Sequence, residues 1–349
     1  MIKIADHTDL MPHLFALSDQ FVRCEHQADV EIWPAAIANE IIEPSDTFAI
    51  FVNQEHDMHT AEVTHEHVRR LRPNNLFAVT AFGNEQHRWP FPVVEFWSNV
   101  YYTFRNNPGP VPLDVEPKPY DGCALFGGWE FGRAQMFEQL QRHGLVEQCL
   151  VNLQPKWTDA GRFTPDQTAQ HTYYRSELIP KLDVPEFIQS AYTPDGLNTM
   201  PQLATSRHSF VSQKIPHALH NQCYVSIVAE TEYFPWRDTV FLTEKIAKPL
   251  IVGQPFLVYS APGTLKYLKA HGLKTFDPWI DETYDSVPLE QRAKAIIRSF
   301  KKFATQSADV KLQMLVEMQT VCKHNQALVT DPAFLLAPIV NAILQKFKL

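Results

Sequence analysis

Short apolar runs alternate with polar stretches in the first third of the chain. Residues 47–52 (TFAIFV) and 76–82 (LFAVTAF) are rich in β-favouring side chains and have the length of buried strands. We expect a helix near residues 65–71, in the polar stretch that separates them. This alternation of strand and helix predicts an α/β domain.

The alternation is clearer after residue 120. Strands are predicted over residues 123–128 (CALFGG), 149–153 (CLVNL), 223–229 (CYVSIVA) and 255–260 (PFLVYS). Helices are predicted over residues 133–142, 243–250 and 262–271, the last closed by Gly272. Elements in this order predict a parallel sheet covered on both faces.

The end of the chain has two more helical patterns, over residues 290–303 and 338–347. The second pattern opens with Pro338, and the first turn of a helix tolerates a missing N–H group. We expect the C-terminal helices to pack back on the first domain.

A proline-rich segment divides the chain. Residues 106–120 (NNPGPVPLDVEPKPY) contain five prolines, which favour extended backbone over helix or central strand. We therefore predict an N-terminal α/β domain over residues 1–118, a C-terminal Rossmann-like domain over 119–325 and a helical tail over 326–349.

Composition and charge narrow the class of protein. Hydrophobic residues make up 45% of the chain, which is enough for two cores, so we expect the whole chain to fold. A formal charge of −8 provides no overall attraction to nucleic acid or anionic lipid. No stretch approaches the roughly 18 apolar residues of a membrane span, and we expect the protein to be neither secreted nor membrane-spanning.

The cysteines carry no metal or disulfide pattern. They are odd in number, widely spaced and never in a CxxC pair, which argues against a disulfide framework or a zinc ribbon and fits a reducing cytoplasm. The five are Cys24, Cys123, Cys149, Cys223 and Cys322.

Two strand-to-helix turns are candidates for anion binding, because ligands of parallel sheets bind beyond the carboxyl ends of the strands. In the first, FGGWEFGR, Gly127, Gly128 and Gly132 permit a tight turn. Arg133 follows in the first helical turn, where a guanidinium can pair bidentately with a diphosphate. The same residues also fit an ordinary turn that is followed by a surface arginine.

The second turn follows the strand over residues 223–229, which ends in Glu230 and Thr231. Thr243, Glu244 and Lys245 then open a helix. As ordinary helix capping, Thr243 is the N-cap and Glu244 favours the positive end of the helix. As a binding site, Glu244 accepts two hydrogen bonds from a ribose diol and Lys245 binds phosphate.

This second segment resembles the donor-binding motif of the α1,3-fucosyltransferases. Glu230 matches the first glutamate of that motif, and residues 243–245 match its Thr-Glu-Lys. Pro255 lies where the next strand of the motif begins, whereas Thr231 replaces an asparagine. The upstream turn with Arg133 resembles the same family in its order of strand, loop, arginine and helix.

The resemblance covers about residues 123–267, and its two matches lie in the right order, about 110 residues apart. It implies that Arg133 and Lys245 hold the donor diphosphate and that Glu244 holds the ribose. The adjoining residues 247–285 are similar to uncharacterised bacterial and phage-encoded glycosyltransferases. The implied fold is GT-B-like, with two Rossmann-like domains facing a cleft.

Sugar transfer needs a neutralised leaving diphosphate and a base for the acceptor hydroxyl. Lys248 is a third candidate cation for the diphosphate, beside Arg133 and Lys245. We expect the base from the other domain, among Asp57, Glu55 and His56, which follow the strand over residues 47–52. Solvated loop residues are the alternative.

Metal chemistry is not indicated. The histidines His56, His59, His65 and His67 lack the HExxH spacing, and no convincing DxD loop is present. We expect a metal-independent enzyme with no cofactor besides its donor, a GDP- or UDP-linked sugar.

An aromatic cluster precedes the proline-rich segment, and its side chains either stack on an acceptor or pack in the core. Its members are Trp89, Phe91, Phe96, Trp97, Tyr101 and Tyr102.

The sequence therefore predicts a glycosyltransferase of the hexosyl, fucosyl or pentosyl type. We expect it to invert configuration and to use a glycan acceptor. One alternative is a phage-type enzyme that glycosylates a hydroxymethylated base in DNA, and another is a non-catalytic nucleotide- or glycan-binding protein of the same fold. The sequence leaves the oligomeric state open.

Overall fold

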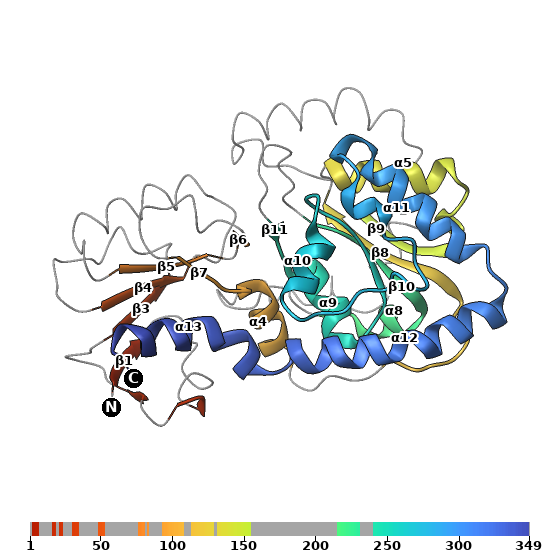
Figure 1. Cartoon of the computed structure of the whole chain (residues 1–349). Coiled ribbons are helices and arrows are strands. Elements are labelled where there is room, and N and C mark those ends of the chain that lie inside the picture. Colours follow the sequence, from red (N-terminus) through yellow and green to blue (C-terminus); the bar gives the residue numbers. More distant parts are fainter. Residues whose placement is uncertain are drawn as a thin grey trace. The chain divides into compact units, whose positions relative to one another are not determined.

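The structure is a computed structural model of the 349-residue chain (Figure 1). It describes residues 2–6, 16–18, 21–23, 30–34, 48–52, 76–80, 82–83, 93–107, 113–128, 131–154, 215–230 and 240–348. The helix expected near residues 65–71 lies outside these ranges.

The chain forms two compact units, each built from separate segments. The first unit consists of Met1–Tyr102, Thr239–Leu242 and Leu328–Leu349, and the second consists of Thr103–Asp238 and Thr243–Ala327. Each unit contains its own parallel sheet.

The sheet of the first unit has six parallel strands in the order β2-β1-β3-β4-β5-β7. The strands are β1 (Ile2–Asp6), β2 (Phe21–Arg23), β3 (Val30–Pro34), β4 (Phe48–Val52), β5 (Leu76–Thr80) and β7 (Val93–Glu95). Strands β4 and β5 confirm the two strands predicted from the apolar runs. Beside this sheet, β6 (Phe82–Gly83) pairs antiparallel with β11 (Val240–Phe241).

The aromatic residues that follow β7 belong to the core. Phe96, Trp97 and Tyr101 are buried at the start of helix α4 (Ser98–Arg105). Helix α13 (Pro332–Lys346) contacts β7, and its Phe334 packs edge-on against Trp97 with ring centroids 5.7 Å apart. For these three aromatic side chains, core packing is therefore the correct alternative.

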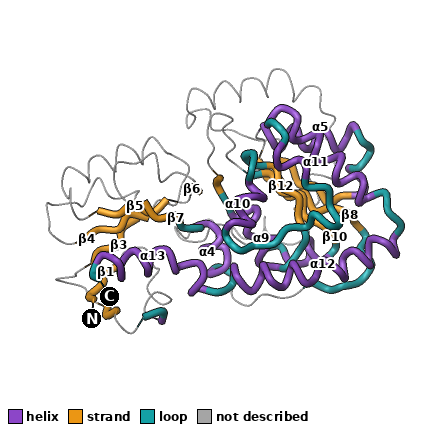
Figure 2. Tube along the Cα trace, viewed as in Figure 1, coloured by secondary structure: helices purple, strands orange, loops and turns teal. Residues whose placement is uncertain are grey.

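The sheet of the second unit has four parallel strands in the order β12-β10-β8-β9. Figure 2 shows the strands of this sheet in orange, with β8, β10 and β12 labelled. The strands are β8 (Tyr120–Gly128), β9 (Cys149–Gln154), β10 (Cys223–Ala229) and β12 (Phe256–Tyr259). All four were predicted from the sequence. The expected parallel α/β architecture is therefore present in this unit.

Helices cover both faces of the four-stranded sheet. On one face, α11 (Leu289–Ala304) contacts β12 and α5 (Phe131–Arg142). Phe300 of α11 lies so close to Gly122 of β8 that a Cβ atom there would meet its ring at 2.9 Å. The helices α8 (His217–Asn221) and α9 (Glu244–Val252) contact β10 and each other. They lie beside Cys123. Because neighbouring residues of a strand face opposite sides of the sheet, Cys123 points to the face opposite to that of Gly122.

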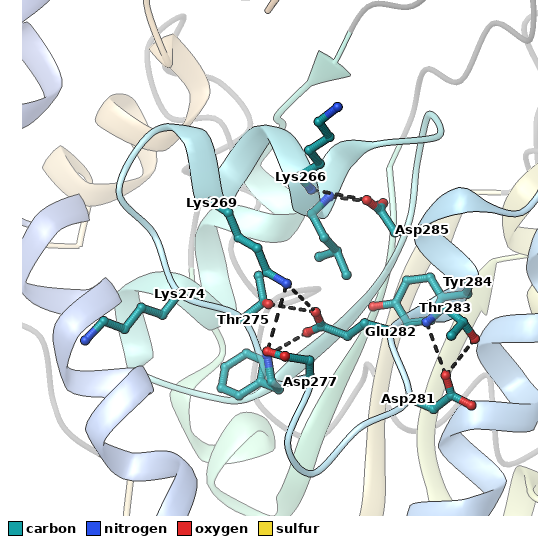
Figure 3. A network of polar contacts seen from close by, with 12 residues as sticks. Lys266, Lys269, Lys274, Thr275, Asp277, Asp281, Glu282, Thr283, Tyr284 and Asp285 are labelled. Carbon is teal, nitrogen blue, oxygen red and sulfur yellow. Dashed lines mark hydrogen bonds and ion pairs between the residues drawn. The ribbon is translucent and has the colours of Figure 1, made fainter.

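A network of polar contacts anchors helix α10 (Thr264–Ala270) to the following loop (Figure 3). Glu282 accepts hydrogen bonds from the Thr275 hydroxyl at 2.7 Å and from the Phe276 backbone N–H at 2.6 Å. Asp285, in the 3₁₀ turn η8 (Thr283–Ser286), accepts from the first N–H groups of α10. The carboxylate of Asp285 thus accepts hydrogen bonds from backbone N–H groups at the start of α10, which have no partner within the helix, and Glu282 does the same for an N–H group of the loop.

The helices at the end of the chain differ from the prediction. Helix α12 (Ala308–Val329) was not predicted, because Val316 is exposed whereas Asn325 is buried and bonded to the backbone of Lys274. Its pattern of side chains is therefore not that of a simple amphipathic helix.

The predicted start of the last helix at Pro338 is wrong. Helix α13 begins at Pro332, after the N-cap Asp331, and Pro338 lies inside it. Pro332 occupies the first turn, where no N–H group is needed. Pro338 removes one hydrogen bond inside the helix, and burial of Leu335, Leu336 and Ile339 compensates for this loss.

No single helix among the described residues is long and apolar enough to cross a bilayer. Helices α12 and α13 satisfy that criterion of length and composition only when they are joined, and the pair is bent by 44°.

Candidate functional site

The four-stranded sheet has a topological switch point between β8 and β10. The strands that follow β8 along the chain lie on opposite sides of it, β9 on one side and then β10 on the other. Because the connections diverge there, ligands of such sheets bind beyond the carboxyl ends of these two strands. Gly127 and Gly128 end β8, and Glu230 directly follows β10. The two predicted anion-binding turns therefore begin at this switch point.

Glu230 joins the end of β10 to the start of α9. Its Oε1 accepts a hydrogen bond of 3.1 Å from the Thr243 backbone N–H, and its Oε2 accepts one from the Thr243 hydroxyl. Glu230 is fully buried, and burial raises its pKa to about 7 although Lys245 and Thr243 act in the opposite direction.

Thr243 is the N-cap of α9, as predicted. Its hydroxyl oxygen accepts a 3.2 Å hydrogen bond from the Lys245 backbone N–H, and Gly253 closes the helix in the left-handed conformation. The hydroxyl thus bonds both Glu230 and the first turn of α9, so the helix start is fixed relative to β10.

Glu244 and Lys245 form an ion pair in the first turn of α9. Lys245 Nζ lies 2.6 Å from Glu244 Oε1, and both side chains are about 15% exposed. Burial alone would raise the pKa of Glu244, but the positive charges of Lys245 and Lys248 and the hydrogen bond from Lys245 lower it to about 2. Glu244 is therefore an anion at neutral pH, and each of its oxygens can accept hydrogen bonds.

Lys248 lies one turn after Glu244 on α9 and is half-buried. Burial lowers its pKa to about 8, although Glu244 partly offsets this effect. Its side chain and that of Lys245 line a cavity of about 20 Å³ against β8 and β10. Two of the predicted cations thus border the same small space.

Arg133 lies in the first turn of α5, directly after the turn that ends β8. It is 4% exposed, so the surface position considered as the alternative is wrong. The helix that carries Arg133 therefore begins just beyond the carboxyl end of β8, the strand that pairs with β10.

Several predicted site residues lie outside the described residues. They are Thr231 and the candidate bases Asp57, Glu55 and His56, together with His59, His65 and His67. Within the parts of the chain that the structure describes, no group of three His, Cys, Asp or Glu side chains is arranged to hold a metal ion.

The structure also reveals a buried polar cluster that the sequence analysis did not single out. Gln254 precedes β12, and its side chain bonds His220 of α8 and Ser226 of β10. None of these three residues lies in a recognisable sequence motif. Gln254 is far from the other two in the sequence, and only the folded chain brings them together.

The sequence matches no family model, and a search of curated proteins finds no match. The chemistry of the site is therefore inferred from its residues.

Proposed function

We propose that the second unit binds a nucleotide-activated sugar beyond the carboxyl ends of β8 and β10, and that the protein is a glycosyltransferase. The observation that carries this proposal is the position of both anion-binding turns at the switch point of one sheet. The resemblance of the same residues to the donor motif of the α1,3-fucosyltransferases supports it independently.

The charges at these strand ends suit a diphosphate. Arg133, Lys245 and Lys248 contribute three positive charges. Glu244 contributes one negative charge, and Glu230 contributes about half of one, because its pKa near 7 leaves it about half protonated at neutral pH. The remaining positive charge stabilises the negative charge that develops on the leaving diphosphate. Glu244 keeps acceptor capacity for the ribose hydroxyls beside its bond to Lys245.

The proposed reaction is an inverting displacement. The acceptor oxygen attacks the anomeric carbon while the bond from that carbon to the donor diphosphate breaks. The acceptor proton passes to a base, for which Asp57, Glu55 and His56 of the first unit remain the candidates. The proposed acceptor is a glycan hydroxyl, and the proposed overall architecture is GT-B-like with no metal requirement.

A thermal-shift screen against GDP-, UDP-, CMP- and TDP-linked sugars tests donor binding. A ligand at about 100 times its dissociation constant stabilises the folded state by about 2.7 kcal/mol, which is a measurable rise in Tm. We expect one nucleotide class to give this rise. If no class does, the proposal is overturned.

Variants that keep the aliphatic stems test the site. Lys245→Met and Arg133→Met should each weaken donor binding about 10- to 100-fold, the effect of losing one hydrogen-bonded charge contact. The control is Lys266→Met, on the exposed part of α10, which should bind as the wild type does. Undiminished binding in both site variants would remove these residues from the site.

Hydrolysis of the bound donor then separates catalysis from binding. Slow release of free sugar from the bound nucleotide sugar is expected of a transferase without its acceptor. A preparation that binds the donor but releases no sugar, with or without acceptor glycans, would be a binding protein instead.

A further inference from the structure

The orientation of the Gln254 side chain is fixed by the backbone. Its Nε2 donates hydrogen bonds of 2.9 Å to the carbonyl oxygens of His220 and Cys223. Because carbonyl oxygens only accept, the amide nitrogen must face them, and Oε1 is the acceptor at the other end of the group.

This orientation also fixes the tautomer of His220. Its Nδ1 lies 2.7 Å from Gln254 Oε1, so Nδ1 carries the proton and donates it. Burial lowers the pKa of His220 to about 4, and the ring is neutral at pH 7. The other ring nitrogen, Nε2, therefore has a free lone pair. It is buried and accepts no hydrogen bond from any protein atom of the described residues.

His220 lines the same cavity as Lys248. With a volume of about 20 Å³ the cavity has room for one water molecule, for which about 10–15 Å³ suffices. In the described part of the chain, the Lys248 ammonium donates no hydrogen bond to a protein atom. His220, whose Nε2 lacks a donor among the described residues, and Lys248, whose ammonium lacks an acceptor there, are thus both lining residues of one water-sized space.

We propose that this cavity is a hydration site, in which one water molecule accepts a hydrogen bond from Lys248 and donates one to His220 Nε2. A chloride ion is a poorer occupant, because it would face the lone pair of Nε2. The water completes a chain from Gln254 through His220 to Lys248. His220 is then a positioning residue that holds the Lys248 ammonium at one place on α9.

This inference goes beyond the proposed function, because it concerns the protein without its donor. The role of the positioned Lys248 in diphosphate binding rests on the proposed function. The two tests of the hydration site do not use a nucleotide sugar. A failure of donor binding would leave the hydration site standing, and the reverse also holds.

The first test is the ¹⁵N NMR spectrum of the histidine side chains in the wild-type protein. We expect His220, assigned by its absence from the spectrum of His220→Gln, to show a protonated Nδ1 and an unprotonated, hydrogen-bonded Nε2 from pH 6 to 8. Lys248→Met should move the Nε2 resonance toward that of a nitrogen without a donor. A protonated Nε2, or a resonance unchanged in Lys248→Met, would overturn the proposal.

The second test measures the pKa of Lys248 by competitive acetylation between pH 6 and 11, read by peptide mass spectrometry. His220→Phe fills the ring volume but removes the acceptor, and Gln254 Oε1 keeps its hydrogen bond from Ser226. We expect the pKa of Lys248 to fall by about one pH unit, because the charged form loses a hydrogen-bonded partner.

The matched control is His220→Gln, whose side-chain oxygen can replace Nε2 as the acceptor and should keep the wild-type value. Labelling of the exposed Lys266 should be the same in all three proteins. Equal Lys248 values in His220→Phe and His220→Gln would show that His220 acts only in packing. If His220→Phe does not fold, the ¹⁵N measurement on the wild type and on Lys248→Met decides alone.

Discussion

The backbone N–H of Thr243 donates a 3.1 Å hydrogen bond to Oε1 of Glu230, thirteen residues earlier in the chain. This bond connects the carboxyl end of a central strand to the first turn of the helix that carries Lys245 and Lys248. A buried carboxylate thus sets the position of the proposed diphosphate-binding residues.

The Glu230 carboxyl makes the stability of the second unit depend on pH. Its pKa is raised to about 7 in the folded protein, so the stabilisation from its proton is complete below the unfolded value near 4.5 and is lost as the pH rises through 7. We expect a loss of up to about 3 kcal/mol over this interval. Urea unfolding from pH 4.5 to 8 measures it.

The matched variant for this prediction is Glu230→Gln, whose amide keeps the oxygen that accepts from Thr243 and does not titrate. The difference in unfolding free energy between wild type and variant should change with pH over the same interval. A constant difference would mean that Glu230 titrates normally.

Asp285 should be important for stability, because it caps the start of α10 (Figure 3) and also pairs with Arg292. It accepts hydrogen bonds of 3.0 and 3.1 Å from the N–H groups of Leu265 and Lys266, and it lies 3.6 Å from the fully buried Arg292 guanidinium. Asp285→Ala removes the cap and leaves a buried cation, at a cost of about 3–4 kcal/mol. Asp285→Asn keeps one acceptor and should cost less.

The control for Asp285 is Asp277→Ala in the same network. Asp277 lies 3.9 Å from Lys269, and both side chains are about half exposed, so its loss should change stability by less than about 1 kcal/mol. Chemical denaturation of all three variants checks this order. An Asp285→Ala variant as stable as Asp277→Ala would contradict it.

Gly122 is predicted to tolerate no side chain. A Cβ atom there would lie 2.9 Å from Phe300 Cζ and 3.0 Å from both Cys149 Sγ and Ile227 Cδ1. We expect Gly122→Ala to lower the unfolding free energy by about 1–3 kcal/mol through overpacking. In the double variant Gly122→Ala/Phe300→Leu, the penalty of the alanine should be smaller than in the wild-type background. An equal penalty would show that Phe300 is not the obstacle.

The described cysteines should not react in the native protein. Cys123, Cys149, Cys223 and Cys322 are all buried free thiols. Burial raises the pKa of the Cys149 and Cys223 thiols well above the usual value, and that of Cys322 to about 12, so little thiolate is present. Iodoacetamide at pH 8 should modify these four only after denaturation, as read by peptide mapping. Rapid native labelling of any of them would contradict the packing of the second unit.

Local patterns in the sequence were sufficient to predict β10 and the cap of α9. A run of seven apolar or small residues specifies a buried strand, and a threonine before a helical pattern specifies an N-cap, because both signals act between near neighbours. Local signals predicted the wrong start for α13, because Pro332 and Pro338 can each begin a helix. Only the packing of the residues between them selects Pro332.

The arrangement of these elements depends on contacts between distant segments. Strand pairing places β10 beside β8, about 100 residues earlier, and this creates the switch point where Gly128 ends β8 and Glu230 directly follows β10. Pairing of β10 with β12 brings Gln254 close to His220, and the hydrogen bond between them selects the tautomer of the ring. Such long-range hydrogen bonds leave no periodic pattern in the sequence, so the residues were visible there but their partnership was not.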